Sequence, residues 1–175
     1  MEILAHEGWL LDDEETLTAY HEAGHATIGF VLGGAVESMQ LGGESDHPGV
    51  RQFGDCRIAW KGVGSNLNTQ CQREILTILA GPAAEMVYRG ESFGIGEFAP
   101  WQQDWQMAWH LVGSLASEKA AKLKILGGVV MQLKEILGRD DCWPAVAALA
   151  DALLAHEHLE EEEVSETLRF WIGRC

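Results

Sequence analysis

Tyr20-His21-Glu22-Ala23-Gly24-His25 contains the pattern H-E-x-x-H, and this stretch decides how the rest of the chain is interpreted. On a helix, residues i and i+4 share one face about 5–6 Å apart. His21 and His25 can therefore bind one metal ion at the ~2.0–2.1 Å of a zinc–nitrogen bond. Glu22 is rotated by about 100° from His21, beside the ligand pair. That position suits a general base for a water molecule activated by the metal.

The residues around the motif predict a helix from about Asp13 to Leu32. Asp12 is expected to be its N-cap, and the helix is expected to stop at 33–34, where two glycines follow each other. The alternative interpretation is that both histidines are paired side chains on a half-buried face. Gly24 argues against it, because glycine inside a helix costs about 1 kcal/mol relative to alanine. We expect Gly24 to allow a neighbouring helix to pass close to the site.

The rest of the chain predicts a mainly α fold with a small β-sheet, in the α+β class. The zincin-like active-site helix is followed by short strands and then by a helical bundle. Strands are expected at 36–41 and 54–60 around a loop at 42–49, and helices at 66–89, about 100–115, 117–137, 141–156 and 160–171. Neither an internal repeat nor a proline-rich linker interrupts the chain, so we predict one domain over residues 1–175.

The chain is strongly acidic, with 12 Lys+Arg against 27 Asp+Glu and a net charge of −15. Such a surface repels phosphate backbones, so we expect no nucleic-acid partner. The longest stretch without Asp, Glu, Lys or Arg, residues 23–36, is shorter than the roughly 20 residues that a spanning helix needs, so no direct membrane insertion is expected. The four cysteines form no C-x-x-C pair and the N-terminus has no secretory pattern, which together predict a cytoplasmic protein.

A catalytic zinc site needs a third protein ligand and leaves a fourth position for water. Spacing alone does not identify that ligand. The candidates left open by the residues are Asp46, His47, Glu85, Asp104 and His110.

Three segments of the chain resemble the peptidase domain of the FtsH family of zinc proteases. They are Tyr20–Ala26, Leu79-Ala80-Gly81-Pro82-Ala83-Ala84-Glu85 and Gln103-Asp104-Trp105-Gln106-Met107-Ala108. The C-terminal helical segments resemble that domain more loosely. The resemblance implies that Asp104 is the third metal ligand. It leaves Glu85 either as an alternative ligand or as a partner that orients a ligand imidazole from behind.

The resemblance implies a zinc-dependent metallopeptidase that hydrolyses peptide bonds of unfolded or short polypeptides. The metal ligands would be His21, His25 and Asp104, and Glu22 would be the catalytic base. The family usually joins this domain to an ATPase module and membrane helices, yet the sequence contains no G-x-x-x-x-G-K-[ST] pattern. We therefore expect a stand-alone peptidase domain whose activity is ATP-independent in this chain.

Two questions about partners stay open at this point: whether a separate ATPase assists the chain, and whether it forms a homo-oligomer. The competing hypothesis for function is a non-catalytic zinc-binding interaction or regulatory module derived from the peptidase fold. The presence of Glu22 argues against that hypothesis, because a structural zinc site does not need a base and fills its fourth position with protein.

Overall fold

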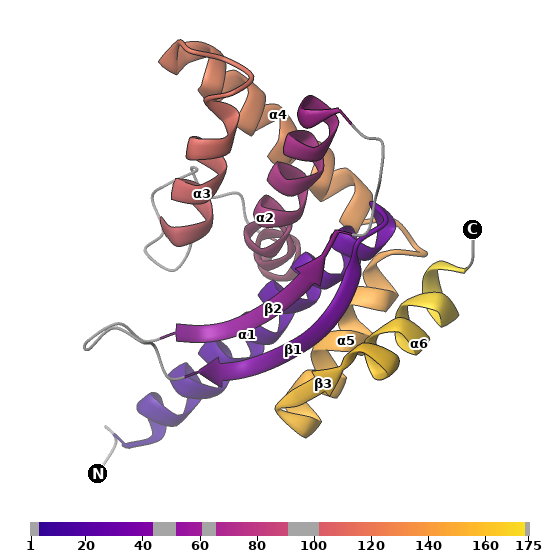
Figure 1. Cartoon of the computed structure of the whole chain (residues 1–175). Helices are drawn as coiled ribbons and strands as arrows, with labels where there is room; N and C mark the ends of the chain where they lie inside the picture. The colour runs from indigo at the N-terminus through magenta and orange to yellow at the C-terminus, as the bar shows by residue number, and fades with distance from the viewer. Residues whose placement is uncertain (1–3, 44–51, 61–65, 91–101, 174–175) are drawn as a thin grey trace.

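The computed structural model describes residues 4–43, 52–60, 66–90 and 102–173. This part of the chain is mainly helical and contains one small antiparallel sheet, so the predicted α+β class is confirmed (Figure 1). The elements are α1 (Leu4–Val31), β1 (Ala35–Gly43), β2 (Gln52–Ala59), α2 (Leu67–Arg89), α3 (Gln102–Val112), α4 (Lys119–Leu137), α5 (Trp143–His156), β3 (His158–Glu160) and α6 (Glu161–Ile172).

Helix α1 starts at Leu4, so the prediction that it begins near Asp13 with Asp12 as N-cap is wrong. A helix that is already nucleated gains one hydrogen bond for each added residue. That gain allows the helix to continue through Asp12, whose helix propensity is at most about 0.7 kcal/mol poorer than that of alanine. The predicted stop is confirmed, because Gly33 adopts a φ of 91° and Gly34 N donates to Gly29 O at 2.8 Å.

The sheet has the strand order β2-β1-β3, and both pairings are antiparallel. The two predicted strands are confirmed as β1 and β2, although residues 44–51, which include most of the predicted loop, lie outside the described residues. The third strand, β3, was not predicted, because it is only three residues long and contains a single buried side chain, Leu159. Among the described strands, β2 pairs with β1 alone and so forms one edge of the sheet.

The remaining helices begin and end close to the predicted positions. Helix α2 starts after Asn66, whose Oδ1 accepts a hydrogen bond from Thr69 N at 2.8 Å, and stops at Gly90 with a φ of 67°. Helix α6 starts with a capping box between Glu160 and Glu163. The predicted start of the third helix, near Pro100, lies outside the described residues, which resume at the beginning of α3.

Helices α1 and α2 pack backbone to backbone through small residues. A Cβ at Gly24 would lie 2.5 Å from the carbonyl oxygen of Ala80 and 2.7 Å from Cβ of Ala84. Both distances are too short for real contacts, so the expectation that Gly24 allows a close neighbouring helix is confirmed. This close packing holds the face of α1 that carries both histidines directly against α2.

One buried apolar cluster includes Ala23 of α1, Leu126 of α4 and Leu168 of α6. In Figure 1 the strands β1 and β2 lie along α1, and α6 lies beside β3. The single domain over residues 1–175 remains a prediction. Within the described ranges, every helix is too short or too polar to cross a membrane.

Candidate metal centre

The two histidines of the motif are each held by a hydrogen bond from α2. Nδ1 of His21 donates to Oε1 of Glu85 at 2.6 Å, and Nδ1 of His25 donates to the backbone oxygen of Thr77 at 2.8 Å. A neutral imidazole that donates from Nδ1 has its lone pair on Nε2. Both rings therefore present Nε2 as a possible metal-binding atom. The hydrogen bond at Nδ1 fixes the tautomer and the orientation of each ring.

Asp104, in the first turn of α3, completes a set of three donor atoms. Its Oδ2 lies 2.9 Å from Nε2 of His21 and 3.8 Å from Nε2 of His25. With bonds of about 2.0–2.1 Å, tetrahedral zinc ligands lie roughly 3.3 Å from one another. The two observed distances bracket that value, so Asp104 needs only a small shift to share one zinc ion with the two histidines, whose ligand atoms lie within 4.8 Å of each other.

Glu85 lies on the opposite side of the His21 ring from Asp104. Its carboxylate is 4% exposed and contacts Nδ1, whereas Asp104 contacts Nε2. From this position Glu85 can fix the orientation of the imidazole and raise its basicity, while the donor atom for the metal points away from it. Of the two roles left open for Glu85, the geometry favours the orienting one.

Glu22 is almost fully buried, with 6% of its surface exposed, and it lies beside the two histidines. The ligand atoms of His21, Glu22 and His25 are all within 4.8 Å of one another. Burial raises the pKa of Glu22 above its ordinary value, although both imidazoles act in the opposite direction. A carboxyl group with a raised pKa takes up a proton more readily than an exposed one, as a general base must.

The charges of His21 and Asp104 depend on each other. Burial lowers the pKa of His21, but the contacts with Asp104 and Glu85 outweigh it, and the pKa is raised well above its usual range. For Asp104 burial raises the pKa, yet His25 and His21 together outweigh burial, and the pKa is lowered. In the metal-free chain the contacts with two carboxylates therefore favour the protonated form of the His21 imidazole.

Gly81 of α2 leaves the space in which an ion would sit. A Cβ at this position would lie 2.5 Å from Nε2 of His25 and 2.6 Å from Nε2 of His21. Any residue other than glycine would place its Cβ there and displace both imidazoles. The donor set, two imidazole nitrogens and one carboxylate oxygen, is also that of catalytic zinc sites. On both counts the residues fit a zinc ion.

The structure therefore brings together five of the side chains that the sequence singled out: His21, Glu22, His25, Glu85 and Asp104. Among the other candidate ligands, His110 is exposed on α3 and lines a separate pocket, and Asp46 and His47 lie outside the described residues.

Sequence reasoning missed two contributors to the site. Gly81 had a detectable signal, since a glycine followed by Pro82 inside a helix is costly without a packing reason. The carbonyl of Thr77 had none, because every residue carries such an oxygen.

Comparison with models of known protein families gives no match, and comparison with curated proteins gives none either. The assignment of these residues to a metal centre therefore rests on their chemistry and geometry.

Proposed function

We propose that this chain is a zinc-dependent metallopeptidase, in which His21, His25 and Asp104 hold the ion. One observation carries the proposal. The two Nε2 atoms converge on one Asp104 oxygen at 2.9 and 3.8 Å, while Glu22 lies buried beside them. A buried carboxylate next to the ligands is what a hydrolytic site requires and a purely structural zinc site does not.

When bound, zinc would acidify a water molecule and polarise the carbonyl of the scissile peptide bond. Glu22 accepts the proton of the attacking water and returns it to the amine that leaves. Its raised pKa favours the first transfer, because a carboxylate with a higher pKa is a stronger base. Glu85 and the Thr77 carbonyl keep both imidazoles in place during these transfers.

Strand β2 supplies a surface on which an extended substrate can lie. Among the described strands it pairs with β1 alone, so its other edge can hydrogen-bond to a polypeptide backbone. It also packs against α1, the helix that carries Glu22 (Figure 1). Only extended chains expose a backbone for such pairing, which favours unfolded or short polypeptides as substrates.

We infer a cytoplasmic location as part of the same proposal. Cys56, Cys71 and Cys142 are free thiols, as expected in a reducing compartment.

The experiment is to add one equivalent of zinc to the metal-free chain and follow the hydrolysis of casein. Cleavage that appears with zinc and disappears with a chelator supports the proposal. Stoichiometric zinc binding without hydrolysis of casein or of a mixed peptide library would favour the competing hypothesis, a non-catalytic zinc-binding module.

A further inference from the structure

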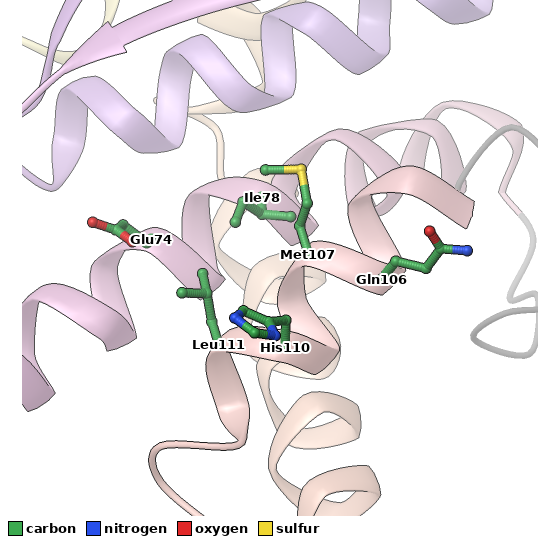
Figure 2. A pocket seen from close by; sticks show the side chains of 6 residues that line it. All are labelled: Glu74, Ile78, Gln106, Met107, His110 and Leu111. Atoms are coloured by element: carbon green, nitrogen blue, oxygen red, sulfur yellow. The ribbon is translucent and has the colours of Figure 1, made fainter. Parts of the chain in front are cut away.

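A pocket of about 410 Å³ lies between α2 and α3, outside the set of metal-binding atoms. Figure 2 shows Ile78 and Met107 close together in it, with Glu74 and Gln106 at opposite ends; His110 and Leu111 complete its lining. Nearly all of the surface that lines it is apolar. Its volume falls in the range of small-ligand sites, which is about 300–1,000 Å³.

Both walls of the pocket are continuous with the metal centre. On α3, Met107 follows Asp104 by three residues, and on α2, Ile78 precedes Gly81 by three. Residues three apart share a helix face and are separated by about 4.5 Å along the axis. The pocket therefore begins about one helical turn from the atoms that would hold the ion.

Contacts between the two helices hold α2 and α3 together beyond the far end of the pocket. Sγ of Cys71 on α2 donates to the backbone oxygen of Leu111 at 3.3 Å and lies 3.3 Å from Oγ of Ser114. These contacts fix the spacing of α2 and α3 one to two turns beyond Ile78. The pocket therefore lies between these contacts and the metal centre.

We propose that this pocket receives a large apolar side chain of the substrate polypeptide, from a residue next to the scissile bond. The inference rests on the proposed peptidase function. Successive residues of an extended chain are about 3.3 Å apart, so a side chain one or two residues from the cleaved bond reaches a pocket that begins one turn away. Ile78, Met107 and Leu111 would set the size of the side chain that is accepted.

The mostly apolar lining favours an apolar side chain over a basic one. Glu74 is the only carboxylate in it, and its Oε1 already accepts a hydrogen bond from Nε2 of Gln70 at 2.8 Å. A cation in the pocket would therefore lose hydration against a mostly apolar lining, with Glu74 at one end as its only charged partner.

The test compares cleavage of a peptide library by the zinc-loaded chain and by pocket variants. Met107→Trp fills the pocket and is expected to shift the preference towards small side chains by at least about tenfold. Ile78→Ala enlarges the pocket and is expected to shift the preference towards larger side chains. Met131→Trp is the matched control, because Met131 is 62% exposed on α4 and lines no part of the pocket.

The outcomes separate this inference from the proposed function. Cleavage with the same side-chain preference in all variants overturns the inference and leaves the peptidase function standing. That outcome is also the one expected if the pocket binds another protein instead of substrate. No cleavage by the unmodified zinc-loaded chain overturns the function, and the inference with it. Met107 is 47% exposed, so its replacement is expected to leave the fold intact, which the zinc content of each variant verifies.

Discussion

Oδ2 of Asp104 lies 2.9 Å from Nε2 of His21, although the two residues belong to different helices, α3 and α1. On the other side of the same ring, Glu85 contacts Nδ1 at 2.6 Å. At pH values below the raised pKa of His21, a proton on Nε2 of the metal-free chain occupies the place of the metal. Several consequences of this arrangement can be measured.

Replacing Asp104 by Ala is expected to weaken zinc binding by roughly 100-fold or more. The substitution removes a charged donor atom. Side chains that only hydrogen-bond to a metal ligand already contribute about 10–100-fold to affinity, so the loss of a ligand itself should cost at least as much. Competition with a chelator measures the effect. Gln103→Ala, an exposed change in the same turn of α3, is the control and should bind zinc like the unmodified chain. Equal zinc affinities for the two variants would exclude Asp104 as a ligand.

Glu85→Gln is expected to weaken zinc binding by about 10–100-fold while one zinc per chain still binds. The amide keeps the size of the side chain but no longer supports the basicity of His21. Glu74→Gln, on the same helix and away from the metal centre, should leave the zinc affinity unchanged. Complete loss of zinc from Glu85→Gln would instead assign Glu85 as a direct ligand.

Gly81→Ala is expected to lower zinc affinity by at least about tenfold, because the new Cβ would lie 2.5–2.6 Å from both Nε2 atoms. Gly127→Ala is a matched control inside helix α4, where a Cβ meets nothing within 4 Å. The control should retain zinc and raise the free energy of unfolding by about 1 kcal/mol. Unchanged zinc affinity in Gly81→Ala would show that the ion does not lie against α2.

The stability of the metal-free chain is expected to fall as the pH rises above about 6.5. The folded pKa of His21 is raised, so its stabilising contribution is complete below the unfolded value of 6.5 and is lost as pH rises through the folded pKa. Glu22, also with a raised pKa, acts in the same direction above its unfolded value of 4.5. The lowered pKa of Asp104 matters only at lower pH, because that contribution is lost as pH falls below 3.8.

Thermal unfolding in the presence of a chelator measures this dependence. His21→Gln should flatten the slope above pH 6.5, since it removes an imidazole whose pKa is raised well above its usual range. A midpoint that rises with pH in the unmodified metal-free chain would contradict the charge assignment of His21 and Asp104.

Much of the fold could be predicted because its signals are local. The caps at Asn66 and Gly90 set the limits of α2, and Gly33 ends α1, each through the backbone of a few neighbouring residues. The start of α1 could not be placed, because a good N-cap residue such as Asp12 is also tolerated inside a helix that extends further. Strand β3 exists only through its pairing with β1, so a local pattern does not reveal it.

The residues of the site also differ in whether a local sequence pattern predicts them. His21, Glu22 and His25 could be predicted together because one helix places them, whereas Asp104 and Glu85 could be assigned only through the family resemblance. Nothing in the spacing of these two carboxylates fixes which of the His21 nitrogens each one contacts. That depends on how α1 and α3 each pack against α2, and the close approach of Gly24 to Ala80 and Ala84 governs only the first of these contacts.

The most direct test of the central claim is casein cleavage by the zinc-loaded Glu22→Gln variant, with the zinc content measured in the same sample. Glu15→Gln, an exposed change on the same helix, is the control. The account predicts one zinc per chain in both variants, with cleavage reduced by about 100-fold or more in Glu22→Gln alone. Cleavage at the unmodified rate by zinc-loaded Glu22→Gln would contradict it.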